Sequence, residues 1–92
     1  MPLSNDEIIA ALASIPGWKL SGAAIERIFS FPDFVAALAF VNQVADAAEK
    51  ANHHPDIAIH YNQVTLSLWS HDSGGVTKRD LKMAATINAI QS

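Results

Sequence analysis

Two segments of this 92-residue chain place their side chains alternately on two faces, and this period of two restricts the fold more than any other feature. In residues 64–70 one face holds the aliphatic Val64, Leu66 and Leu68. The other face holds Thr65, Ser67 and Trp69, and His71 continues it. In residues 25–31 one face holds Ile25, Phe29 and Phe31 together with Arg27. Alternation of this kind predicts strands that are buried on one side only.

Each alternating segment has a neighbour in the sequence with which it can pair. Residues 18–20 are extended and precede a turn at Ser21-Gly22. Residues 56–61 are separated from the second alternating segment by Asn62-Gln63. Strands joined by such short turns pair antiparallel, so we predict two hairpins.

A short helix is predicted at the N-terminus, because Ser4 and Glu7 have the spacing of a capping box. It should stop at Pro16-Gly17. Its predicted buried stripe consists of Ile8, Ile9, Leu12 and Ala13.

Two longer helices are predicted by the same kind of signal. Asp33 can cap a helix that runs to about Lys50 and is ended by His54-Pro55, since proline disfavours helical backbone in the residue before it. Thr77, with Asp80 three residues later, marks the start of a last helix. The residues expected to pack this helix are Leu81, Ala84, Ala85, Ile87 and Ile90.

The predicted order is helix, strand, strand, helix, strand, strand, helix (α-β-β-α-β-β-α). Hairpins with helices between them form an antiparallel sheet that is covered by helices on one face. We therefore expect an α+β fold, with one domain over residues 1–92. Its four-stranded antiparallel sheet should carry three helices packed on one face.

The helix expected over residues 33–50 is apolar around most of its circumference. Its polar residues fall on one narrow side: Asn42, Asp46, Glu49 and Lys50. A helix that packs on one layer needs only an apolar stripe. The wider surface predicts a second contact, either with another subunit or deeper within the same fold.

Composition excludes several classes of function. The chain has no cysteine, so disulfides and thiolate metal sites are absent, and its formal net charge of −3 disfavours binding to nucleic acid or anionic lipid. The N-terminus does not resemble a signal peptide, and no apolar run approaches the ~20 residues that span a bilayer. We expect a soluble, cytoplasmic protein without a direct nucleic-acid or membrane partner.

Three of the four histidines fall into two short groups, His53-His54-Pro55 and Ser70-His71-Asp72. Imidazole is the side chain whose ordinary pKa, about 6.5, lies closest to neutral pH. Such a cluster can donate one proton and accept another without a metal or cofactor. One group should end a helix and the other a strand, so both can meet at one edge of the sheet.

The histidines belong to a longer set of motifs: residues 49–55 (Glu-Lys-Ala-Asn-His-His-Pro), Tyr61-Asn62, Ser70-His71-Asp72 and residues 75–80 (Gly-Val-Thr-Lys-Arg-Asp). With these motifs the chain resembles the pterin-4a-carbinolamine dehydratase family, and residues 25–34 are similar to that family too. It implies a hydro-lyase that dehydrates a 4a-hydroxytetrahydropterin to a quinonoid dihydropterin. In that family the substrate comes from aromatic amino-acid hydroxylases, which links the enzyme to regeneration of their tetrahydropterin. The family also implies a homodimer or homotetramer.

The resemblance assigns roles to particular residues. His53 and His71 match the principal catalytic histidines and His54 the supporting one; we favour His53 as base and His71 as acid, although the sequence does not fix that direction. The implied pterin contacts are His53, His54, Pro55, Ser70, His71, Asp72 and Ser73. Glu49 could orient His53 or be an exposed helix residue, and Asp80 is better explained as a helix cap than as a catalytic group.

Two other functions compete with catalysis by histidine alone. The three histidines with Asp56 or Asp72 could bind zinc, but no familiar ligand spacing is present, so we expect no metal and no cofactor. The resemblance also allows a non-catalytic protein-binding module, because some relatives serve as a dimerisation cofactor of a transcription factor or as assembly factors. Retention of all three histidines favours the enzyme.

Overall fold

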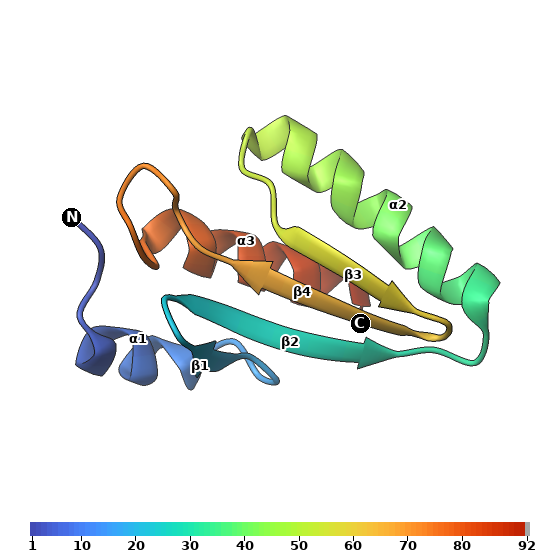
Figure 1. The fold of residues 1–92 in the computed structure, drawn as a ribbon, viewed down its shortest axis with the longest axis horizontal. Helices are drawn as coiled ribbons and strands as arrows, with labels where there is room; N and C mark the ends of the chain where they lie inside the picture. Colours follow the sequence, from blue (N-terminus) through green and yellow to red (C-terminus); the bar gives the residue numbers. More distant parts are fainter. Residues whose placement is uncertain (92) are drawn as a thin grey trace.

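The computed structural model describes residues 1–91 and has the predicted order of elements (Figure 1). The helices and strands are α1 (Asn5–Leu12), β1 (Lys19–Ser21), β2 (Ala24–Ser30), α2 (Phe34–Ala51), β3 (Asp56–His60), β4 (Gln63–Leu68) and α3 (Lys78–Gln91). The predicted N-caps at Ser4 and Asp33 are confirmed, and Ser4 and Glu7 form both bonds of the capping box.

The four strands form one antiparallel sheet in the order β1-β2-β4-β3, so the two predicted hairpins lie side by side. The central pair aligns Ile25 with Leu68 and Phe29 with Val64. These four side chains are at most 2% exposed, because they lie on the face that the helices cover. The α+β fold predicted from the alternating segments is confirmed.

Helices α2 and α3 pack together on this face, and α1 lies beside β1 (Figure 1). Ala37, Phe40, Val44, Ala84 and Ile87 supply the helical side of the core. Three predictions of buried helix residues are wrong: Ile9 is 57% exposed, and Ala13 and Ala85 are also exposed. The eight-residue α1 touches the sheet along one line centred on Ile8, so the wider predicted stripe has nothing to pack against.

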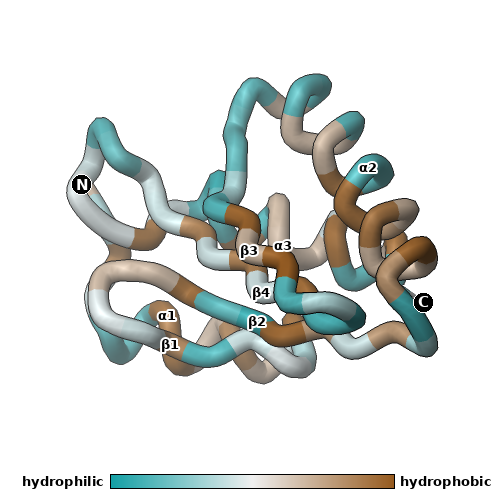
Figure 2. The backbone as a smooth tube through the Cα atoms, turned by 45° about the vertical axis from the view of Figure 1, so that its right-hand side comes forward, coloured by the Kyte–Doolittle hydropathy of each residue, from teal (hydrophilic) through white to brown (hydrophobic). Residues whose placement is uncertain are grey.

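Helix α2 ends within a residue of the predicted Lys50, but a different residue ends it, and this changes where the histidines lie. The helix ends at Ala51 because Asn52 adopts left-handed backbone (φ 50°), and its N–H bonds the carbonyls of Ala48 and Glu49. Asparagine tolerates this conformation better than most residues. The prediction that His54-Pro55 ends the helix is therefore wrong. His53 and His54 belong to a hydrophilic connection between α2 and β3 (Figure 2).

The second hairpin turns one residue earlier than predicted. Its tip is Tyr61-Asn62, with Tyr61 at φ 54°, whereas Gln63 already pairs with His60 in the sheet. Asn62 fixes the tip, since its side-chain amide donates to the Phe31 carbonyl at 2.9 Å. At the other end of β4, Ser70 pairs with Gly75 and closes the loop that carries His71.

Candidate active site

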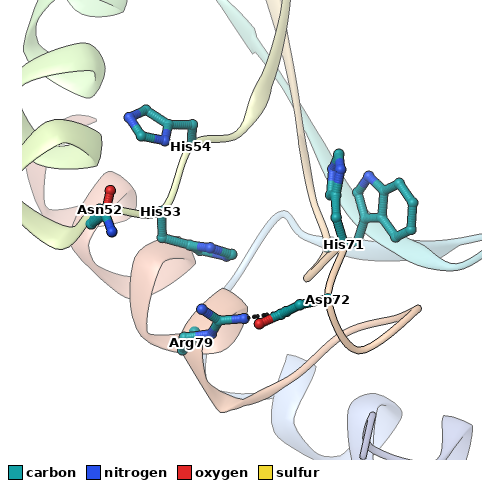
Figure 3. A pocket seen from close by; sticks show the side chains of 7 residues that line it. Asn52, His53, His54, His71, Asp72 and Arg79 are labelled. Atoms are coloured by element: carbon teal, nitrogen blue, oxygen red, sulfur yellow. Dashed lines mark hydrogen bonds and ion pairs between the residues drawn. The ribbon is translucent and has the colours of Figure 1, made fainter.

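An open pocket lies where the connection after α2, the end of β4 and the start of α3 meet (Figure 3). Its volume is about 340 Å³, within the range of small-molecule sites. The lining residues are Asn52, His53, His54, Trp69, His71, Asp72 and Arg79. All three histidines singled out in the sequence therefore line one pocket, with His53 and His54 on one side and His71 on the other.

His53 is held by a carboxylate from α3. Its Nε2 lies 2.5 Å from Oδ1 of Asp80, and the His53 side chain is 11% exposed while that of Asp80 is fully buried. A carboxylate at one ring nitrogen fixes the tautomer and orientation of an imidazole. In the neutral ring Nε2 then carries the proton, and Nδ1 is the nitrogen that can accept one.

Asp80 is itself fixed by the start of α3 and the end of β4. Its Oδ2 accepts hydrogen bonds from the Ser70 hydroxyl at 2.9 Å and from the Thr77 N–H at 2.8 Å. The bond to Thr77 is the helix-cap role predicted for this residue. The contact with His53 is a second role, which uses the other carboxylate oxygen. Ser70 is therefore buried beneath the pocket and supports Asp80.

His71 is exposed and stacks on Trp69. The two ring centroids are 4.0 Å apart, with 30° between the ring planes. Within the described residues His71 makes no hydrogen bond, so the indole is the contact that orients its ring. Trp69 is half-buried like Thr65 and Ser67, so it continues the face opposite the core, and the stack places His71 there too, as the alternation predicted.

His54 is held more loosely. Its Nε2 lies 2.5 Å from Oε2 of Glu49, but the two side chains are 55% and 77% exposed. In Figure 3 its ring points away from His71. Glu49 therefore contacts His54 and not His53, because the left-handed turn at Asn52 carries His53 off the helical spacing. Of the two alternatives left open for Glu49, the structure agrees with an exposed helix residue.

An exposed ion pair closes the bottom of the pocket. Arg79 donates to Asp72 at 2.6 Å and joins the His71 loop to the first turn of α3 (Figure 3). Three residues predicted to contact a ligand lie outside the pocket lining: Pro55 is half-buried after His54, Ser70 is fully buried, and the Ser73 N–H bonds the Ser70 carbonyl.

Three lining residues were missed by the sequence analysis: Asn52, Trp69 and Arg79. The alternation that placed Trp69 and His71 on one face could have identified Trp69. No local signal marked Arg79, since its position depends on how α3 approaches the β4 loop.

Among residues 1–91, no three His, Cys, Asp or Glu side chains are grouped so that they could hold a metal ion. Within the same residues, no helix is both long and apolar enough to cross a membrane.

A sequence model of the family described as pterin 4 alpha carbinolamine dehydratase matches residues 1–90. The chain belongs to this family. A Koribacter versatilis protein named "Putative pterin-4-alpha-carbinolamine dehydratase" is 59% identical over 88 residues, which is 96% of this chain and 94% of that protein. A protein of the same name from Acidobacterium capsulatum is 58% identical, again over 96% of each chain.

Solved structures show the same family fold. A transcriptional coactivator/pterin dehydratase from Brucella melitensis superposes with a TM-score of 0.93 at 41% identity, over the full length of both chains. A pterin dehydratase-like RuBisCO assembly factor of the alpha-carboxysome superposes with a TM-score of 0.65 over 79% of this chain and 84% of its own. At 19% identity, that second likeness concerns the fold alone.

Proposed function

We propose that this protein dehydrates 4a-hydroxytetrahydropterins by general acid–base catalysis. The observation that carries the proposal is His53, held at Nε2 by the buried Asp80 and lining the same pocket as His71. Family membership supplies the substrate class, and the pocket volume of about 340 Å³ suits one bicyclic ring. The hydroxylated pterin would come from an aromatic amino-acid hydroxylase, as in other family members.

The reaction needs one proton delivered and one removed. The C4a–O bond breaks as the departing hydroxyl is protonated and leaves as water, and loss of the N5 proton allows a C4a=N5 double bond to form. His53 acts as base through Nδ1, because Asp80 stabilises the positive charge that develops on its ring. His71 acts as the acid. Groups placed in this way typically contribute about 10²–10⁴-fold in rate each.

A stopped-flow dehydration assay tests this function. His53→Ala and His71→Ala should each lose at least about tenfold in kcat, with unchanged circular dichroism. His60→Ala is the matched control, because His60 is exposed on β3 outside the pocket lining and should keep the wild-type rate. Wild-type rates in both pocket variants would overturn the proposal.

A second candidate is a protein-binding module on the same fold, as the names of the two structural relatives suggest for those proteins. It is favoured by apolar side chains on the first turns of α2, where Phe34 is 45%, Val35 75% and Leu38 40% exposed. Such a surface suits a partner or a second copy of the chain. If the purified protein shows no dehydration above the uncatalysed rate, this second function replaces the first.

A further inference from the structure

A second hollow adjoins the histidine pocket on the far side of His53. Its volume is about 220 Å³, and it is lined by Ala51, His53, Arg79, Lys82, Met83 and Thr86. It shares His53 and Arg79 with the pocket, so these two side chains stand between the two hollows. We call this second hollow the α3 groove.

The start of α3 carries half of the basic residues of the protein, and two of them line the α3 groove. Three of the six basic residues of the chain, Lys78, Arg79 and Lys82, occur within five positions at the start of α3. The N-terminal end of a helix is already electropositive, so cations are unfavourable there. A chain with a formal net charge of −3 thus gathers positive charge at the position where the helix tolerates it least.

The three basic side chains differ in how they are paired. Arg79 pairs with Asp72, and Lys78 lies close enough to Glu7 to lower the pKa of that carboxyl further, after the hydrogen bonds from Ser4. Lys82 forms no ion pair within residues 1–91, and it lines the α3 groove. The groove therefore offers an uncompensated ammonium group beside His53.

The chemistry of the pterin connects this charge to the substrate. In a pterin the reacting nitrogen N5 is bonded to C4a and to C6, and C6 carries the side chain. If His53 removes the N5 proton, the atom that bears the side chain lies one bond away. The C6 side chain of the pterin then extends from the ring next to His53, at the point where the α3 groove begins.

We propose that the α3 groove is a subsite for an anionic group on the C6 side chain. The preferred substrates are then 4a-hydroxytetrahydropterins whose side chain ends in a phosphate or a carboxylate, with Lys82 as the specificity residue. This proposal rests on the proposed function for the position of the pterin ring, and it adds the chemical class of the C6 side chain.

The test compares side chains that differ only in charge. Wild-type enzyme is assayed with the 4a-hydroxytetrahydro forms of a 6-hydroxymethylpterin, its phosphate monoester and a 6-carboxyalkyl analogue. We expect a KM at least about fivefold lower for the anionic compounds, with kcat little changed, and a smaller difference in high salt. The KM values of the phosphate monoester and the 6-carboxyalkyl analogue show which acidic group the groove prefers.

Lys82→Gln should raise KM for the anionic substrates alone and leave the neutral substrate unaffected. Lys82→Arg should retain the preference. Lys19→Gln is the matched control, because it removes one positive charge from β1 at the opposite edge of the sheet. Equal KM values for charged and neutral substrates, or equal effects of Lys82→Gln and Lys19→Gln, would overturn the subsite.

Binding measurements separate this proposal from the proposed function. Calorimetric titration with 6-hydroxymethyl-7,8-dihydropterin and its phosphate monoester reports the subsite without any turnover. A phosphate preference that Lys82→Gln removes supports the groove even if the protein proves inactive, whereas equal affinities overturn the groove even in an active enzyme.

Discussion

Oδ1 of Asp80 lies 2.5 Å from Nε2 of His53, although 27 residues separate the two in sequence. The carboxylate is fully buried, and its other oxygen accepts hydrogen bonds from Ser70 and Thr77. The Asp80 side chain thus caps α3 and orients His53, which follows the end of α2. Stability of the fold and activity of the candidate site should both depend on this carboxylate.

Asp80→Asn should lower kcat by about 10²–10⁴-fold, because the amide can present its NH₂ group to His53 and favour the wrong tautomer. The loss of a charged acceptor should also destabilise the fold by about 1–3 kcal/mol. Stopped-flow rates and denaturant unfolding measure the two effects. Ser70→Ala is the control, since it removes one donor to Asp80 without touching His53; an equal loss of kcat in this variant would contradict the orienting role.

Trp69→Ala should lower kcat by about 10- to 100-fold, because His71 loses the ring that orients it. Trp69→Phe keeps an aromatic face and should restore kcat to within about threefold of wild type. The two variants are compared by kcat and KM, with thermal unfolding as a check on folding. If phenylalanine and alanine reduce kcat equally, stacking is not what places His71.

Glu49→Gln should have a small effect, in contrast to Asp80→Asn. The Glu49–His54 pair is largely exposed, and exposed ion pairs contribute about 0–1 kcal/mol and are screened by salt. We expect a change in unfolding free energy below about 0.5 kcal/mol and a nearly unchanged dehydration rate. A large loss of rate would show that His54 needs its partner during catalysis.

If copies of the chain associate through the start of α2, Val35→Glu should weaken that association. Val35 is 75% exposed, so a charge there leaves the fold intact but opposes any apolar contact through the start of α2. Light scattering across a range of concentrations measures the change in mass. Phe40 is unsuitable for this test, because it is 4% exposed and part of the core. An unchanged oligomer in Val35→Glu would remove this helix face as the contact surface.

Acid should weaken the cap of α1. The hydrogen bonds from the Ser4 backbone and side chain lower the pKa of Glu7 below its usual 4.5. A lowered pKa in the folded state means that the ionised group stabilises the fold above the unfolded pKa, and that this contribution is lost as the pH falls through the folded value. Unfolding curves between about pH 3 and 6 should therefore show a weaker pH dependence for Glu7→Gln. Equal pH dependence in the two proteins would contradict the cap.

Much of the fold could be predicted from local signals. The caps at Ser4 and Asp33 join groups three residues apart, and the strand face of Val64, Leu66 and Leu68 follows from a period of two. Such features depend on backbone geometry over one or two turns, so the sequence carries them directly. The end of α2 near Lys50 was predicted as well, but the residue that ends the helix is the left-handed Asn52 and not His54-Pro55.

Local patterns in the sequence were enough to predict the elements, their order and the three histidines of the candidate site. Tertiary packing alone sets which carboxylate meets which imidazole: Asp80 meets His53, and Glu49 meets His54. It also decided that Trp69 supports His71 and that Arg79 and Lys82 lie beside His53. These relationships depend on how α3 packs against α2 and the end of β4, and contacts between distant segments leave no periodic signal in the chain.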